Sequence, residues 1–416
     1  MNWKKKTVQE IKSTIIDALE LNVDYKNGQI IGLPGSHLDE KVFSRDTFNL
    51  LETPFLHSLL LNPNHIGCHT LGSSESFFKG TQELEKEVIS ICAQEILKGG
   101  EEQFDGYVAA GGTEANMQAV WVYRNFYQVK RNASSEQIAL FSSSDSHYSM
   151  AKAVNVFVIK HFAVRVNSET RALDKEDLEN KIISAKNQGV KYVIVVANMM
   201  TTMFGSVDDV NLYVELFKKH QLEYKIHIDG AYGGFYYPFS NEKDKLMNFA
   251  NPEVTSVTLD AHKMAQAPYG TGIFLIRKNY IHYATTKEAS YIEGEDCTLI
   301  GSRSGANAIS IWMILFTYGH YGWKEKMLII QNRTDRLCQQ LDELNIDYFR
   351  NQYSNIVTMN ASQVSTDLAE AYGLIPDNHH QPSWYKIVVM EHVTMDKLEG
   401  FLGAFKKELD RGINLG

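Results

Sequence analysis

A lysine that could do chemistry lies in the stretch 256-SVTLDAHKMAQAPYG-270, where residues 256–260 predict a strand and Lys263 follows almost at once. The residues after Lys263 are mostly small or apolar, an unusual setting for a solvated side chain. A lysine amine withdrawn from water can act as a nucleophile and form a Schiff base with a carbonyl compound. A lysine in a turn can equally be an ordinary solvated side chain, so Lys263 needs partners before it indicates a reaction.

Polar residues that could serve such an amine follow two other apolar runs. Gly111, Gly112 and Thr113 lie between a predicted strand and a predicted helix. Free N–H groups and the positive end of a helix dipole suit a phosphate there, although a tight turn with a helix cap has the same pattern. Asp229 ends another apolar run, beside His227, and a buried aspartate needs a cationic or N–H partner. A plain turn cap is the alternative for Asp229.

His147, in 144-SDSHYS-149, follows a further apolar run and adds an aromatic ring, although it can equally be a core histidine. A phosphate cradle, an aromatic histidine, a buried carboxylate and a nucleophilic lysine are together what pyridoxal 5′-phosphate (PLP) requires. The lysine holds the cofactor aldehyde, and the aspartate keeps the pyridine nitrogen protonated so that the ring accepts electrons. Their order along one sheet is more specific than any single member, so the sequence predicts a PLP site.

The elements that would position these residues alternate between about 100 and 300. Apolar strands without polar alternation, separated by helices, predict an α/β fold with a mainly parallel sheet covered on both faces. Ligands of such sheets bind at the carboxyl ends of the strands, where the residues above lie. The strands are predicted at 106–109, 138–142, 154–159, 192–197, 225–229, 256–259 and 272–276, and the helices at 81–97, 114–129, 147–153, 174–187 and 208–220.

The chain divides into three predicted parts. Residues 1–75 hold an amphipathic helix at 8–21 and an irregular segment, and 76–305 form the large cofactor-binding domain. Residues 306–416 form a smaller α+β domain. Its predicted elements, together with the helix that leads into it, are helices at 303–319, 323–344 and 394–409 and strands at 346–349, 354–358 and 386–390.

Composition excludes several classes of protein. The chain has 416 residues, 44% of them hydrophobic and 22% charged, with a net charge of −9, which argues against nucleic-acid or anionic-membrane partners. Four cysteines without a CxxC pair predict no disulfide framework, and no apolar run is long enough to span a membrane. The segment 65-HIGCH-69 has metal-ligand residue types but lacks a clustered fourth ligand, so we expect no metal. The sequence predicts a cytoplasmic enzyme.

The chain resembles the group II PLP-dependent amino-acid decarboxylases over about 65–410, with the motifs in the family's order. The nearest resemblance is to the branch of bacterial histidine and plant serine decarboxylases, and the archaeal tyrosine/aspartate decarboxylases are similar too. The resemblance implies the aspartate-aminotransferase fold (fold type I) and a homodimer with active sites at the subunit interface. The motifs are 111-GGTEAN-116, 145-DSHYS-149, 207-VDD-209, 229-DGA-231, 260-DAHK-263, 301-GSR-303 and 388-VVMEHVT-394.

The resemblance implies cofactor contacts for nine residues. Lys263 would form the Schiff base, Asp229 would pair with the pyridine nitrogen, and Ala231 and His147 would lie on the two ring faces. The phosphate would be bound at the start of the 114–129 helix, and Asp260 is not expected to touch it directly, because a carboxylate beside a phosphate is unfavourable. The nine are Gly112, Thr113, His147, Thr202, Asp229, Ala231, His262, Lys263 and Ser302.

Two further features follow from the resemblance. Thr202 matches a threonine near the 3′-oxygen of the cofactor, but Met200 replaces the usual glycine before the threonine pair. Tyr291 lies in the segment matching a mobile loop that reaches the neighbouring subunit, where a tyrosine returns a proton to the product. Tyr291 can also be a plain strand-edge aromatic, and His147 is the other candidate proton donor.

The resemblance implies an α-decarboxylase that converts an L-amino acid to its amine and CO2. The amino acid is not determined, since histidine, serine, aromatic and acidic amino acids all have relatives on this framework. His69 would line the substrate entrance.

The alternatives are an aminotransferase or carbon–carbon lyase, or a non-catalytic PLP-binding protein. An aminotransferase needs an arginine for the substrate carboxylate, and the candidates Arg333, Arg336 and Arg350 match no motif. A decarboxylase has reason to avoid that clamp, because pairing the leaving carboxylate stabilises the ground state.

Overall fold

The structure is a computed structural model that describes residues 28–29, 31–32, 39, 41–42, 79–285 and 296–410. The predicted helix 8–21, the segment 65-HIGCH-69 with His69, and Tyr291 lie outside the described residues. No described helix is both long and apolar enough to cross a membrane.

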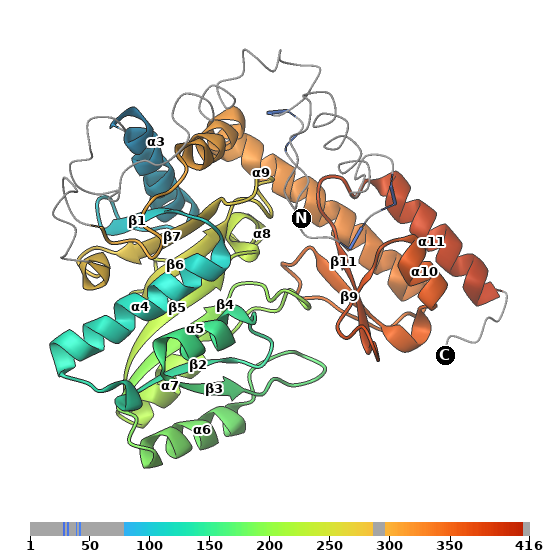
Figure 1. Cartoon of the computed structure of the whole chain (residues 1–416). Helices are drawn as coiled ribbons and strands as arrows, with labels where there is room; N and C mark the ends of the chain where they lie inside the picture. The colour runs from blue at the N-terminus through green and yellow to red at the C-terminus, as the bar shows by residue number, and fades with distance from the viewer. Residues whose placement is uncertain are drawn as a thin grey trace, which may run out of the picture.

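A seven-stranded sheet forms the centre of the larger unit within the described residues (Figure 1), in the order β1-β7-β6-β5-β4-β2-β3. Neighbouring strands from β6 through β5, β4 and β2 to β3 are parallel, whereas β7 is antiparallel to both β6 and β1. The mainly parallel sheet predicted from the apolar runs is therefore confirmed. The strands are β1 Phe104–Ala109, β2 Ile138–Ser143, β3 Lys160–Val164, β4 Tyr192–Asn198, β5 Glu223–Gly230, β6 Val254–Asp260 and β7 Gly272–Arg277.

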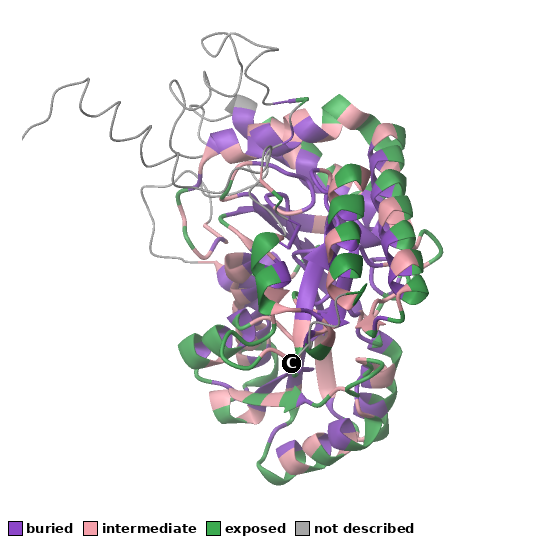
Figure 2. Ribbon diagram, turned by 90° about the vertical axis from the view of Figure 1, so that its right-hand side faces the viewer, coloured by how far each residue is buried: buried purple, intermediate pink, exposed green. Residues whose placement is uncertain are grey.

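Helices cover both faces of this sheet, which explains why its strands carry apolar residues on both sides. Alternate strand residues enter two separate cores, one shared with α4 (Gly112–Arg131) and α5 (Ser149–Phe157). The other core is shared with helices on the opposite face. Figure 2 shows the buried strands between helices whose outer faces are exposed. The helices of the opposite face are α3 Lys79–Ser90, continued by a π-helix over Ile91–Ile96, α6 Lys175–Asn187, α7 Val210–Lys219, α8 Tyr237–Ser240 and α9 Gly305–Glu343.

The predicted strand at 154–159 is wrong, because that segment belongs mostly to α5. Met150, Ala153 and Phe157 are buried at helical spacing, and Val158 ends the helix in a left-handed conformation with φ 53°. The strand that follows, β3, lies at the sheet edge and alternates between half-buried and exposed residues, with only its last residue, Val164, buried. Three valines in and after the last turn of α5 gave this segment the residue types of a strand. The edge strand itself begins with a lysine and a histidine, which do not indicate a buried strand.

A long helix connects the large sheet to a smaller unit. α9 is broken at Gly319, whose φ of 62° is not helical, at the gap between the two predicted helices. The smaller unit contains an antiparallel sheet of order β10-β11-β9-β8 with α10 and α11 beside it (Figure 1), and the predicted division at residue 305 falls at the start of α9. Its elements are β8 Tyr348–Phe349, β9 Ile356–Asn360, α10 Thr366–Ala371, β10 Ile375–Pro376, β11 Trp384–Val388 and α11 Met395–Asp410.

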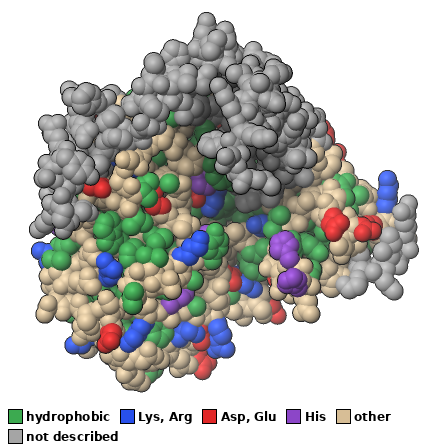
Figure 3. Space-filling view, viewed as in Figure 1, with side chains coloured by type: hydrophobic (Ala, Val, Ile, Leu, Met, Phe, Trp, Pro, Cys, Tyr) green, Lys and Arg blue, Asp and Glu red, His purple; other side chains and the backbone are tan. Residues whose placement is uncertain are grey.

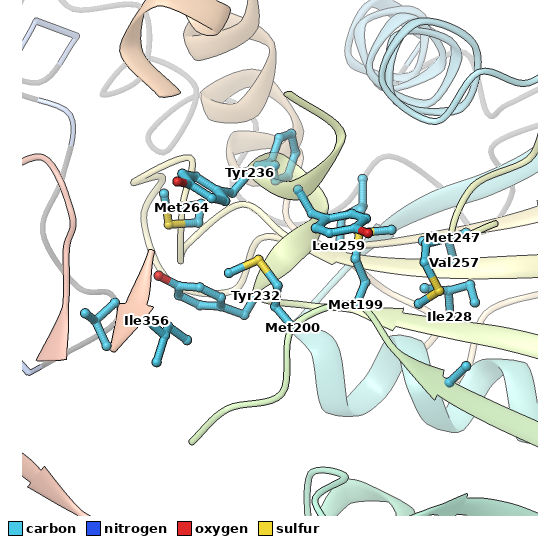
Figure 4. Close-up of a cluster of buried hydrophobic side chains, with 14 of the residues drawn as sticks. Met199, Met200, Ile228, Tyr232, Tyr236, Met247, Val257, Leu259, Met264 and Ile356 are labelled. Carbon is cyan, nitrogen blue, oxygen red and sulfur yellow. The ribbon is translucent and has the colours of Figure 1, made fainter. Parts of the chain in front are cut away.

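The two units share one apolar core. Met199, Tyr232 and Leu259, from the large unit, belong to the same buried cluster as Ile356 of β9. Figure 4 shows Ile356 near Tyr232, on the side where the small sheet meets the large one. The indole N–H of Trp323 in α9 also donates to the Phe235 carbonyl at 3.0 Å. The small unit is therefore packed firmly enough to form part of a site on the large one.

A buried ion pair ties α3 to the turn before α9. The guanidinium of Arg303 contacts the Glu85 carboxylate, and both side chains are almost fully buried. The same carboxylate accepts the Val108 N–H at 2.6 Å, and Arg303 Nη1 donates to the Val108 carbonyl at 3.2 Å. This pair therefore anchors the edge strand β1, which leads directly to the glycines at the start of α4.

We expect Glu85→Gln to destabilise the fold by about 3–5 kcal/mol, because it leaves the Arg303 charge buried without its partner. The measurement is urea unfolding followed by circular dichroism. Glu215→Gln is a matched control, since Glu215 pairs with Lys175 on the surface with both side chains about three-fifths exposed. That change should cost less than about 1 kcal/mol. Equal losses in the two variants would contradict the assigned importance of the buried pair.

Candidate active site

A cavity of about 530 Å³ opens at the carboxyl ends of β1, β4, β5 and β6. Figure 3 shows a hollow in this face of the molecule, with basic and histidine side chains visible inside it. Parallel strands end at one edge of a sheet, so loops distant in sequence meet there. The described lining residues include Gly111, Gly112, Thr113, Asn116, Met117, His147, Tyr148, Asn198, Met200, Thr202, Asp229, Ala231, Tyr232, Asp260, His262, Lys263, Tyr269 and Leu299.

The first turn of α4 forms one end of this cavity. Gly111 precedes the helix with φ 156°, and no side chain caps the helix N-terminus. A Cβ at Gly112 would lie 2.7 Å from Asp260 Oδ2 and 2.9 Å from the Ala231 Cβ, so only glycine allows the helix to start this close to β5 and β6. The free N–H groups of this turn, with the helix dipole behind them, can bind an anion.

Lys263 lies beside two other polar residues of the 260-DAHK-263 turn. Its Nζ is 3.2 Å from Asp260 Oδ2, and His262 Nε2 is 3.6 Å from the same oxygen. The His262 ring stacks on Tyr269 with centroids 4.7 Å apart. Burial lowers the pKa of His262, despite the nearby Asp260 carboxylate, so the ring is neutral near pH 7.

Asp229 ends β5 at the floor of the cavity and is 7% exposed. Its Oδ2 accepts a hydrogen bond from Asn116 Nδ2 at 2.8 Å, and its Oδ1 accepts the Ala231 N–H at 3.1 Å. Both donors are neutral amide groups, so neither forms an ion pair with this carboxylate.

His147 follows β2 and is held from its Nδ1 side. The Ser149 hydroxyl lies 2.9 Å from Nδ1, and the Ser149 N–H donates to Nδ1 at 3.3 Å. An Nδ1 that accepts the backbone N–H carries no hydrogen, so the neutral ring has its hydrogen on Nε2. Burial lowers the pKa of His147, with Asp229 acting in the opposite direction, and the ring is therefore neutral near pH 7.

The loop after β4 forms another part of the wall. Thr202 lines the cavity with its backbone carbonyl bound to Lys386 Nζ of β11 at 2.9 Å. Met200, where the family motif has glycine, adopts φ 71° in the left-handed region that favours glycine. Figure 4 shows its side chain beside Tyr232, which also lines the cavity. Met200 therefore accepts backbone strain and fills space that glycine would leave open.

The structure brings eight of the nine predicted cofactor residues into the wall of this cavity. Ser302 is the exception, since it is exposed in the turn before α9 and does not line the cavity of its own chain. Tyr291 lies outside the described residues. The contacts that these residues make with a cofactor stay predictions.

Asn116 and His227 also belong to this site, although no role was predicted for either from the sequence. Asn116 lies one helical turn after Gly112, so it faces the same side of α4, and His227 precedes Asp229 by two positions and shares its face of β5. Those spacings were a usable signal. Tyr148 and Tyr269, which line the cavity although both are more than half exposed, had no such signal.

The cavity fits PLP. The uncapped turn of α4 suits the phosphate, Lys263 Nζ suits the aldehyde, and the Asp229 carboxylate suits a protonated ring nitrogen. His262 Nδ1 is buried without a hydrogen-bond partner, next to Gly111, so a polar ligand group can satisfy it. No group of three potential metal ligands occurs in the described part of the chain.

No arginine lines the cavity among the described residues. Arg333 donates to the Glu391 carbonyl at 2.9 Å, and Arg350 pairs with Asp335 at 2.6 Å, so both are committed within the small unit. Arg336 lies on the surface of α9. The described wall therefore lacks the carboxylate clamp that an aminotransferase of this fold needs.

Comparison with known proteins agrees with this chemistry. The model of the pyridoxal-dependent decarboxylase conserved domain matches residues 62–363. A tryptophan decarboxylase of Clostridium sporogenes is 48% identical over 406 residues, which is 97% of each chain. A probable L-tyrosine/L-aspartate decarboxylase of Methanothermobacter thermautotrophicus is 30% identical over 330 residues, covering 77% of this chain and 86% of that one. The narrower resemblance to histidine and serine decarboxylases stays a prediction.

Solved structures share the fold at lower identity. L-methionine decarboxylase from a Streptomyces species superposes with a TM-score of 0.78 at 20% identity, covering 99% of this chain and 96% of that chain. Sphingosine-1-phosphate lyase of Burkholderia pseudomallei gives 0.79 at 14% identity, covering 98% and 92%. With the family model spanning most of the chain, the protein belongs to the pyridoxal-dependent decarboxylase family and is a PLP-dependent carboxy-lyase acting on an amino acid.

Proposed function

We propose that the protein decarboxylates an aromatic L-amino acid, with tryptophan as its main substrate, in a homodimer in the cytoplasm. The observation that carries the substrate class is the charge of the cavity wall. Lys263 is the one basic residue of lysine or arginine type among the described lining residues, and it is paired with Asp260. His147 and His262 are neutral near pH 7, because burial lowers the pKa of both rings.

An acidic substrate side chain would have no cation to pair with on this described wall. It would instead face carboxylates, since Glu114, Asp229 and Asp260 also line the cavity. Placing a charge in a confined site without a partner costs several kcal/mol. The wall therefore disfavours aspartate and glutamate as substrates.

An aromatic side chain meets suitable contacts instead. Met117, Met200, Tyr148, Tyr232 and Tyr269 line the cavity, and thioether and aromatic groups pack well against an indole ring. The 48% identity with a tryptophan decarboxylase along nearly the whole chain supports the same substrate.

PLP, when bound, supplies a ring that takes up the electron pair left behind by departing CO2. The protein's own part is to hold and orient. Lys263 Nζ would bind the aldehyde, the N-terminal turn of α4 would bind the phosphate, and Asp229 would keep a proton on the ring nitrogen. His147 would cover the ring and present its Nε2 hydrogen, and Ala231 would pack against the ring as well. Without an arginine in the described wall, the substrate carboxylate is not stabilised before it leaves.

The homodimer is supported by surfaces that a single chain leaves open. Phe316, Tyr321 and Ile329 of α9 are more than half exposed, as are Tyr148 and Tyr269 at the cavity. Contiguous apolar surface left in water commonly marks an interface. Tyr291, from the segment that follows Thr285, would then serve the cavity of the partner chain as proton donor.

The substrate proposal predicts decarboxylation of tryptophan with a kcat/KM at least about 100-fold above that for aspartate or glutamate, since an unpaired buried charge costs more than about 3 kcal/mol. Amine and CO2 are measured for each amino acid with the purified holoenzyme. Phenylalanine and tyrosine separate an aromatic preference from a narrower indole preference. Faster turnover of an acidic amino acid would refute the substrate class while leaving the decarboxylase family intact.

The role of Asp229 predicts that Asp229→Asn lowers kcat by at least about 100-fold, because the neutral amide fills the same space but cannot stabilise a protonated ring nitrogen. Lys263 is untouched in this variant, so the visible absorbance of the bound cofactor serves as a control for loading. Near-normal turnover in the loaded Asp229→Asn protein would rule out the electrostatic role.

The shared-site proposal predicts complementation between two inactive variants, Lys263→Ala and Tyr291→Phe. When they are unfolded and refolded together, random pairing gives mixed dimers in which one site has both native residues, and activity returns to about a quarter of wild type. Native mass spectrometry confirms that mixed dimers form. Mixed dimers without activity would show that Tyr291 acts within its own chain, whereas full activity of Tyr291→Phe by itself would show that Tyr291 is not the proton donor.

A further inference from the structure

A line of buried hydrogen bonds runs from Asp229 into the protein interior, behind the cavity. Asn116 Nδ2 donates to Asp229 Oδ2 at 2.8 Å, and Asn116 Oδ1 lies 2.9 Å from His227 Nε2. His227 Nδ1 lies 2.6 Å from the Ser256 hydroxyl, and the Tyr123 hydroxyl donates to that oxygen at 2.5 Å. The four residues behind Asp229 come from α4, β5 and β6, and each is at most 1% exposed.

The chemistry of these groups determines every direction in the line. An ionised carboxylate only accepts, so the Asn116 amide must turn its nitrogen to Asp229 and its oxygen to His227. That oxygen needs a donor, so His227 Nε2 carries a hydrogen, which Thr258 Oγ1 also approaches at 3.1 Å. Burial lowers the pKa of His227 to about 4, so the ring is neutral and Nδ1 accepts from Ser256. All the donors in the line therefore point toward Asp229.

Asn116 also supports the histidine of the cavity. Its Nδ2 lies 3.3 Å from the Ser149 hydroxyl, the group that lies 2.9 Å from His147 Nδ1. A half-turn of this amide would place Asn116 Oδ1 against the Asp229 carboxylate and remove both donations. The hydrogen on His227 Nε2 opposes that half-turn, because it would then face the amide N–H2 group.

We infer that Asn116 and His227 are positioning residues of the decarboxylase, with His227 locking the Asn116 amide in the orientation that donates to Asp229 and holds its carboxylate toward the ring nitrogen of the cofactor. The inference rests on the proposed role of Asp229 and deepens it. Hydrogen bonds linked in one direction reinforce one another, so a distant member such as Tyr123 contributes weakly and Asn116 strongly.

The test measures the protonation of the cofactor ring nitrogen directly. Holoenzyme is prepared with PLP labelled with ¹⁵N in the ring, and nitrogen NMR is recorded alongside kcat for tryptophan. In Asn116→Leu and His227→Leu we expect the protonated fraction to fall and kcat to drop about 10- to 100-fold, as for loss of a hydrogen bond to a charged group. His227→Gln should recover much of both signals, because its amide N–H can replace the one on Nε2.

Two buried tyrosines of α4 provide a matched control. Tyr123, the last member of the line, donates to Ser256, whereas Tyr127 donates to the Val193 carbonyl at 3.0 Å. Both tyrosines are fully buried. Tyr123→Phe should shift the nitrogen signal slightly and lower kcat by about two- to fivefold, the effect of a weak neutral hydrogen bond. Tyr127→Phe should leave the nitrogen signal unchanged.

The outcomes separate this inference from the proposal beneath it. An unchanged nitrogen signal in loaded Asn116→Leu, or equal shifts in the two tyrosine variants, would overturn the positioning role. Should Asn116→Leu fail to fold, the contrast between His227→Gln and His227→Leu decides the question in the same way. An unprotonated ring nitrogen in the wild-type protein would instead refute the proposed role of Asp229 itself.

Discussion

The geometry of the site depends on one close approach, between the first turn of α4 and the ends of β5 and β6. At Gly112 the helix is so near the sheet that an added Cβ would lie 2.7 Å from Asp260 and 2.9 Å from Ala231. The helix can therefore present its free N–H groups to the cavity, and one turn later Asn116 reaches Asp229. A larger residue at 112 would push the helix outward. The helix N–H groups would then move away from the cavity, and Asn116 would move away from Asp229. The anion-binding end and the carboxylate end of the cavity are thus set by the same contact.

The opposite wall depends on the small unit and on one arginine. Lys386 of β11 donates to the Thr202 carbonyl. Burial, together with the positive charge of Lys263, lowers the pKa of Lys386 to about 8. Arg171 bonds both oxygens of Asp145, close to His147, and its guanidinium lies 3.7 Å from the Phe204 ring centroid. The loops after β2 and β4 are therefore tied to each other and to the small sheet, so the wall is assembled from parts far apart in sequence.

Much of this arrangement is predictable from sequence, because residues directly after buried parallel strands must meet at one edge of the sheet. That rule was enough to bring Lys263, Asp229 and His147 together. It could not predict the hydrogen bonds behind Asp229, such as the one between Asn116 and His227. Apolar periodicity indicates which residues are buried, but not which buried polar side chains contact each other. The edge strand β3 was misplaced for a related reason, as only one of its five residues is buried. The left-handed backbone at Met200 had only the missing glycine of the family motif as a signal.

The fold does not decide which bond is broken, since a sphingosine-1-phosphate lyase shares it with a TM-score of 0.79. The choice must lie in the cavity wall. In the part of the wall that the structure describes, Lys263 is the one lysine or arginine, and it is paired with Asp260 at 3.2 Å. His147 and His262 are neutral near pH 7. A wall without a free cation leaves the α-carboxylate of the substrate unpaired, which favours its departure as CO2. The same wall gives an acidic side chain nothing to pair with. One electrostatic property therefore supports both the reaction and the proposed preference for an aromatic substrate.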